Sequence, residues 1–270
     1  MICLFCNSKK DFNTVEHIIP ESLGNKELVL KGEVCDKCQK HLSKIERYVL
    51  SNTPMGFWRT ILGIKTKKGK FASVDFNKST EDRGILPDAH KHHDNISFIA
   101  RDYDLTELIV HNSSQDQFEG GMPTQVKYVI TPKVVFEIGR FLGKIGLELL
   151  CLENSQNARK SEFDQIRRYI RSGLARDIWP IFYQANGDIS DLVKYKYQAG
   201  CVTEEVFCYD YSIFESDGYV VFNFTVGIDN WAICLNEMFP DPRIIQKLEE
   251  RGVKVLWYSR TSWEKSKSKA

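Results

Sequence analysis

Two cysteine pairs near the N-terminus are the clearest chemical feature of this 270-residue chain. Cys3 and Cys6 form one C-x₂-C pair, and Cys35 and Cys38 form the other. Each pair can present two thiolates to one tetrahedral Zn²⁺ ion. Because the chain shows no export signal, such pairs favour a metal over disulfide bonds. The spacing therefore predicts a structural zinc site made by these four cysteines.

The 28 residues between the two pairs contain a second group that could do chemistry, Glu16 followed by His17. A neutral imidazole near pH 7 can act as a general base on water. A carboxylate can hold a divalent metal ion, which offsets the charge of a phosphate. Neighbouring residues of a strand point to opposite faces, so both can reach one phosphate only at a strand end or turn. Pro20 and Gly24 are consistent with such a turn.

The order of these motifs resembles the HNH endonuclease family, in the branch whose ββα core is held by four cysteines. The resemblance rests on a short cysteine pair, an E-H-I-x-P-x-x-L-G segment at residues 16–24 and a later V-C-x-x-C segment. It covers about residues 3–46. It implies a ββα-metal, treble-clef-like module with a structural Zn²⁺ ion and a catalytic Mg²⁺ or Mn²⁺ ion. In the family pattern, the residue at the place of Glu16 ligates the catalytic metal, and the histidine at the place of His17 activates water.

The second half of the family pattern is met less closely. The residue after the fourth cysteine is normally His or Asn, and here it is Gln39, whose amide oxygen can also ligate a hard cation. His41 lies two residues on, so on a helix it does not share a face with residue 39. It could serve if the helix begins late, contact a backbone phosphate, or simply face solvent. Asn25, which follows Gly24, is the candidate for the Asn that braces the loop behind the base. The expected catalytic residues are His17, Glu16, Gln39, His41 and Asn25, with Glu16 and Gln39 as ligands of the catalytic metal.

A helix expected over residues 39–50 completes the module. Its apolar side chains have helical spacing and should face inward: Leu42, Ile45 and Val49. Basic side chains at spacings of three and four should form a row on another face: Lys37, Lys40, Lys44 and Arg47. Such a row can contact phosphates without reading sequence, although a solvated helix face has the same pattern.

The expected fold class is α+β, with the HNH module at residues 1–60 and a larger mixed α+β domain at residues 71–270. Strands are predicted at 71–76, 95–101, 125–130, 202–211, 219–226 and 231–235. Helices are predicted at 131–152, 163–170 and 242–252. The second domain is expected to pack around the 131–152 helix and to serve recognition, assembly or regulation, with a homodimer or a protein partner as possible arrangements.

Charge is unevenly distributed along a chain whose formal net charge is +1. Residues 1–70 carry 13 Lys and Arg against 7 Asp and Glu. This excess is a hint of a phosphate-bearing partner, although a solvated surface explains it equally well. No apolar run is long enough for a membrane span and no signal peptide is recognised, so a cytoplasmic protein without a membrane partner is expected.

Together these features predict an endonuclease that hydrolyses double-stranded DNA in restriction or antiviral (phage) defence. The alternative is a zinc-stabilised nucleic-acid-binding or assembly module that has lost catalysis, and an RNA substrate is a third interpretation. The cluster His90, His92, His93 and Asp94 is weighed as a metal site against a polar loop, which is favoured. The remaining cysteines are expected to be core thiols: Cys151, Cys201, Cys208 and Cys234.

Overall fold

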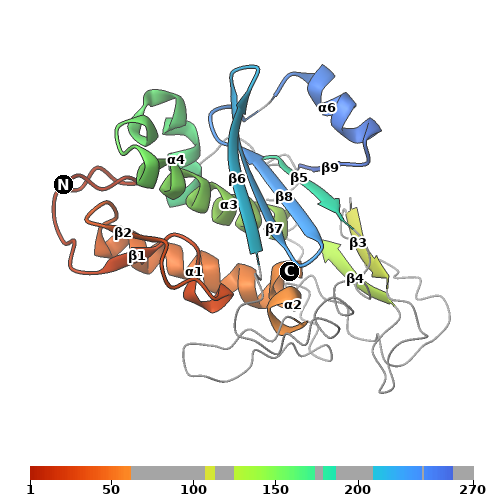
Figure 1. The fold of residues 1–270 in the computed structure, drawn as a ribbon, viewed down its shortest axis with the longest axis horizontal. Coiled ribbons are helices and arrows are strands. Elements are labelled where there is room, and N and C mark those ends of the chain that lie inside the picture. The colour runs from red at the N-terminus through yellow and green to blue at the C-terminus, as the bar shows by residue number, and fades with distance from the viewer. Residues whose placement is uncertain (62–106, 113–124, 174–178, 187–208, 239, 258–270) are drawn as a thin grey trace, which may run out of the picture.

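The computed structural model describes residues 1–61, 107–112, 125–173, 179–186, 209–238 and 240–257 (Figure 1). Its N-terminal part has the expected ββα order: β1 (Val15–His17), the 3₁₀ turn η1 (Glu21–Leu23), β2 (Val29–Lys31) and α1 (Asp36–Asn52). The two short strands pair in antiparallel register, with His17 opposite Val29. The larger second part combines helices with antiparallel strands, so the α+β class is confirmed.

Helix α1 has the two faces that the sequence predicts. Leu42, Ile45 and Val49 are buried, and the basic row is exposed at all four positions. The helix begins at Asp36, three residues earlier than predicted. The Asp36 carboxylate accepts hydrogen bonds from the backbone of Asn13 and Thr14, and a carboxylate in the first turn also suits the helix dipole.

The sequence places the domain boundary between about residues 51 and 70, and a second helix that it does not predict, α2 (Pro54–Ile61), lies within this segment. Proline suits the first turn of a helix, because its missing N–H is not needed at that position. Phe57 and Trp58 of α2 are buried, and one continuous hydrophobic core joins residues of the HNH-like part to residues of the sheet. Residues 62–70 lie outside the described part of the chain, and the division into domains at 1–60 and 71–270 stays a prediction.

An antiparallel sheet forms the centre of the second part. Its order is β6 (Tyr209–Ser216), β7 (Tyr219–Val226), β8 (Asp229–Cys234), β5 (Ile181–Ala185) and β9 (Lys254–Leu256). A separate antiparallel pair contains β3 (Glu107–Asn112) and β4 (Gln125–Ile130). The strands predicted at 125–130 and 219–226 are confirmed, and the one predicted at 231–235 begins two residues earlier. The predictions at 71–76, 95–101 and most of 202–211 lie outside the described residues.

Helix α3 (Pro132–Glu153) lies between α1 and strands β7 and β8, and contacts all three elements (Figure 1). It begins as predicted, with the Thr131 hydroxyl accepting from the Val134 N–H at 3.3 Å. Close approach is possible because Gly143 packs against Ile170 and Gly146 against Phe222.

Shorter helical elements complete the fold: η3 (Asn157–Arg159), η4 (Ser161–Phe163), α4 (Asp164–Ser172) and α6 (Pro242–Glu250). α4 begins one residue later than the helix predicted from 163, and α6 begins at the predicted Pro242. Among the residues that the structure describes, no helix has both the length and the apolar character that crossing a bilayer requires.

Candidate zinc and nuclease centre

Three backbone segments bring the four cysteines together at one end of α1. Cys3 and Cys6 lie in the N-terminal turn, Cys35 is the N-cap residue of α1, and Cys38 lies in its first turn. The four Sγ atoms all lie within 4.8 Å of one another, and those of Cys6 and Cys35 are 3.5 Å apart. Tetrahedral zinc with Zn–S bonds of about 2.3 Å holds its sulfurs about 3.8 Å apart. The cluster therefore fits a structural zinc ion.

The electrostatics of the cluster also call for a cation. A hydrogen bond from Cys38 lowers the pKa of the Cys3 thiol to about 4, although burial opposes this. The same interaction raises the pKa of Cys38, and burial raises that of Cys35. Four thiolates at these distances repel one another unless a cation lies between them, and Zn²⁺ supplies that charge. In the described ranges, this is the one group of His, Cys, Asp or Glu side chains with metal-binding geometry.

His17, the expected base, is the last residue of β1. Its side chain is 30% exposed, and its Nε2 atom lies 3.4 Å from Oε1 of Glu21. Its Nδ1 atom is buried and has no hydrogen-bond partner within the described ranges. The ring therefore lies at the surface of the module with a carboxylate beside Nε2.

Glu16 lies on the opposite side of the strand from His17, inside the protein. It is 6% exposed, and its Oε1 atom lies 2.8 Å from Nζ of Lys144 on α3. Burial raises the pKa of the Glu16 carboxyl, and the charge of Lys144 opposes that rise. The strand end does not bring the side chains of residues 16 and 17 to one point.

Gln39 is held by its own hydrogen bonds. Its amide nitrogen donates to the carbonyls of Thr14 (3.1 Å) and Val34 (3.0 Å), and its amide oxygen accepts from the Thr14 hydroxyl at 2.8 Å. These contacts tie the start of α1 to the segments before β1 and after β2. With Glu16 bound to Lys144 and Gln39 bound in this way, the two expected ligands do not fit a shared catalytic metal ion in this arrangement.

His41 and Asn25 have separate environments. The His41 side chain is exposed, and its Nε2 atom lies 2.8 Å from a guanidinium nitrogen of Arg140. Partial burial, and then the charge of Arg140, lower the pKa of His41. Asn25 is buried inside the loop between β1 and β2. Its amide donates to the carbonyls of Ile19 (2.6 Å) and Leu28 (3.0 Å), and its oxygen accepts two backbone N–H groups of the same loop.

Sequence reasoning missed the partners that α3 brings to the module. Lys144 lies at the centre of a group of carboxylates that includes Glu46 and Glu148. The signal was present in the sequence, because Arg140, Lys144 and Glu148 are charged residues at spacings of four in an otherwise apolar helix. Such a stripe cannot face an apolar core, so it indicates a polar partner.

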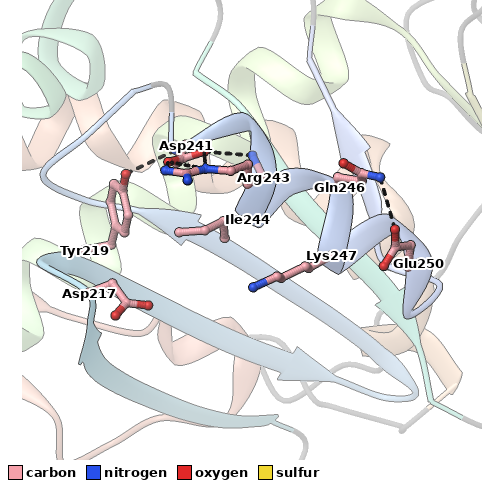
Figure 2. Close-up of a pocket in the computed structure, with 8 residues that line it drawn as sticks. All are labelled: Asp217, Tyr219, Asp241, Arg243, Ile244, Gln246, Lys247 and Glu250. Atoms are coloured by element: carbon pink, nitrogen blue, oxygen red, sulfur yellow. Dashed lines mark hydrogen bonds and ion pairs between the residues drawn. The ribbon is translucent and has the colours of Figure 1, made fainter.

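A cavity of about 570 Å³ lies between α6 and the β6–β7 turn. Arg243 pairs there with Asp241 at 2.6 Å, and Gln246 pairs with Glu250 at 3.1 Å (Figure 2). Both contacts join residues of α6 or its N-cap, so they stabilise this helix and give no indication of a ligand. The histidine cluster at residues 90–94 lies outside the described residues, as do Cys201 and Cys208. Cys151 and Cys234 are buried, as expected.

Comparison with known proteins agrees with the N-terminal geometry. Residues 3–52 match the HNH endonuclease family. No curated protein and no solved structure matches the chain. The matched segment contains the four-cysteine cluster, β1, β2 and α1, so this ββα part of the chain is similar to the HNH endonuclease family.

Proposed function

We propose that this protein is a DNA endonuclease whose HNH domain hydrolyses phosphodiester bonds with His17 as general base. The observation that carries the proposal is the position of His17. It is a partly exposed imidazole at the end of β1, within the segment that matches the HNH family, and the same segment carries a cysteine cluster that fits zinc.

In this reaction Nε2 of His17 takes a proton from a water molecule, and the water oxygen attacks phosphorus. The bond from phosphorus to the leaving sugar oxygen breaks, and that oxygen takes up a proton from a solvent water molecule. The Glu21 carboxylate, 3.4 Å from Nε2, lies where it can accept a hydrogen bond from the N–H that forms in the first step. The predicted Mg²⁺ or Mn²⁺ ion would act as a Lewis acid on the phosphate. Because Glu16 and Gln39 do not fit that ion in this arrangement, the steps above do not depend on it.

The exposed row of α1 supports a nucleic-acid substrate. Its members are Lys37, Lys40, Lys44 and Arg47, all of which face solvent. Phosphate contacts of this kind position a duplex without reading its sequence. One such domain has one centre and cuts one strand at a time, so a double-strand break requires a dimer or two successive nicks. Restriction or phage defence is the proposed setting, with the second part of the chain in recognition, assembly or regulation.

The test is cleavage of supercoiled plasmid by zinc-loaded protein, with and without Mg²⁺ or Mn²⁺. His17→Ala should retain zinc and slow nicking by about 10²–10⁴-fold, the usual contribution of a general base. Val15→Ala is the matched control, because Val15 is an exposed residue of the same strand and should nick at the wild-type rate. Equal rates for wild type and His17→Ala would refute the assignment. A parallel assay on RNA of the same sequence decides between the two substrates.

A second candidate function is a zinc-stabilised nucleic-acid-binding or assembly module without catalysis. The observation that favours it is that both expected metal ligands are held elsewhere, Glu16 by Lys144 and Gln39 by Thr14 and Val34. Such a protein would shift DNA in a gel but nick neither DNA nor RNA with any divalent ion. His17→Ala would then leave binding unchanged.

A further inference from the structure

A stripe of three charged residues on α3 faces the HNH domain from outside the segment that the family covers. Arg140, Lys144 and Glu148 are spaced four apart, which places them on one face of the helix. All three are buried, and Lys144 is only 1% exposed. Burying a charge is costly unless it is paired and hydrogen-bonded, so the partners of this stripe define its role.

The ammonium of Lys144 has an unusually complete set of oxygen neighbours. It donates to the backbone carbonyls of His17 at 2.7 Å and Ile18 at 2.9 Å. Three carboxylates also approach it: Glu16 and Glu46 at 2.8 Å and Glu148 at 3.0 Å. An ammonium has three protons, so five oxygens within 3.0 Å resemble the shell of a bound cation more than the hydrogen bonds of an ordinary lysine.

The surrounding charges keep Lys144 protonated. Burial opposes its charge, but Glu148, Glu46 and Glu16 outweigh that effect and hold the pKa of Lys144 well above its ordinary value. An isolated buried ion pair often adds nothing to stability compared with apolar packing. Lys144 also donates hydrogen bonds to the backbone carbonyls of His17 and Ile18, so it restrains the backbone at the end of β1 as well.

This restraint acts at the proposed catalytic residue. The carbonyl that accepts the shorter of the two backbone hydrogen bonds belongs to His17 itself. The Glu16 carboxylate, where an HNH domain is expected to hold its catalytic ion, instead contacts the lysine. We propose that Lys144 is a positioning residue for His17. Its ammonium fixes the His17–Ile18 backbone and pairs with the Glu16 carboxylate, where a divalent ion would otherwise bind. The first part of this inference, the positioning of His17, rests on the proposed nuclease function. The second part, the pairing of Lys144 with Glu16 in place of an ion, does not.

The first experiment separates positioning from general stability. Lys144→Met combined with Glu148→Met removes the ammonium and one carboxylate together, with side chains of similar length, and Glu148→Met alone is the matched control. Single-turnover plasmid nicking is measured at several enzyme concentrations, all in excess over the DNA, to obtain the rate constant and the half-saturating concentration. Small misplacements of a catalytic group can cost up to about 10²-fold.

The expected result is a double variant that retains zinc and melts cooperatively, but nicks at least about tenfold more slowly than Glu148→Met. Its half-saturating concentration should stay within about twofold of the control, because the basic row of α1 is untouched. A double variant with the rate constant of its control would overturn the positioning role, as would a loss confined to DNA affinity.

The second experiment needs no variant of Lys144 and no cleavage. Binding of Mn²⁺ to zinc-loaded protein is followed by electron paramagnetic resonance in the wild type and in Glu16→Gln. Because Lys144 already pairs with the Glu16 carboxylate, the wild type and Glu16→Gln should bind Mn²⁺ equally. A wild-type Mn²⁺ site that Glu16→Gln abolishes would show that the ion displaces Lys144, and the inference would be wrong. This comparison decides the second part of the inference by itself, even if the double variant fails to fold or the wild type does not cut DNA.

Discussion

The contact between α2 and the sheet allows a quantitative test of how firmly the HNH domain is joined to the rest of the chain. Trp58 of α2 donates from Nε1 to Oδ2 of Asp229 at 2.7 Å, and Tyr183 of β5 donates to Oδ1 of the same residue at 2.8 Å. Asp229 is fully buried. Burial, and then the charge of Asp229, raise the pKa of Tyr183, so its hydroxyl remains a donor throughout the accessible pH range.

Tyr183→Phe removes one donor with almost no change in volume. A hydrogen bond to a charged group contributes about 1.5–3 kcal/mol, so the free energy of unfolding should fall by about 2 kcal/mol. Trp58→Phe removes the other donor and also part of a fully buried ring that packs against the backbone of Gly227. Adding the loss of buried surface and the resulting void gives an expected decrease of about 3–5 kcal/mol.

Urea unfolding at pH 7, followed by tryptophan fluorescence and by circular dichroism, measures both changes. Because the two donors share one carboxylate, the double variant should deviate from additivity by about 0.5–3 kcal/mol. All variants should keep one zinc ion per chain, since the four cysteines belong to other segments. A decrease below about 0.5 kcal/mol for Tyr183→Phe, together with full additivity, would refute the view that Asp229 anchors α2 to the sheet.

Three further perturbations test the module itself. Removing zinc with a strong chelator should unfold residues 3–52 and abolish DNA nicking. Structural zinc contributes roughly 10 kcal/mol or more to the stability of such small modules. Unchanged hydrogen exchange in β1 and α1 after zinc removal would contradict this prediction. Burial raises the pKa of Glu148 well above 4.5, so its contribution to stability is present at low pH and is lost as pH rises through the folded-state pKa. Glu148→Gln, which mimics the protonated form, should therefore lose less melting temperature than the wild type as pH rises above about 4.5, and a difference independent of pH would exclude this role. Asn25→Ala removes four hydrogen bonds from a buried loop and should cost about 2–4 kcal/mol in urea unfolding, with slower nicking if the loop supports His17; a change below about 1 kcal/mol would exclude a bracing role.

The features that sequence predicted well are those encoded by short spacings. Two C-x₂-C pairs determine a cysteine cluster almost regardless of what surrounds them, and the structure brings the four sulfurs together. The alternation of residues 219–226 gave β7 with its observed bounds, because one face of that strand is buried and the other is less so. Thr131 and Pro132 marked the start of α3 for a local reason, namely capping of the first turn.

The features that sequence missed depend on distant contacts. No helix was predicted at residues 54–61, yet proline can begin a helix, and the contact of the buried Trp58 with Asp229 favours one there. The role of Glu16 was inferred from the family pattern. Its actual partner, Lys144, is far away in the chain, and no local pattern pairs the two.

Helix α1 has one face that is open to solvent and another that contacts α3. The basic row faces solvent and is left open for a phosphate backbone, whereas Glu46 contacts Lys144 of α3 and His41 contacts Arg140. Arg159, just beyond α3, adds a 2.6 Å ion pair to Glu33 beside the cysteine cluster. The contacts from α3 therefore reach the segments that carry His17 and the cysteines, not the surface offered to DNA. Under the proposed nuclease function, we expect substitutions in α3 to lower the rate of cutting before they alter affinity for the substrate.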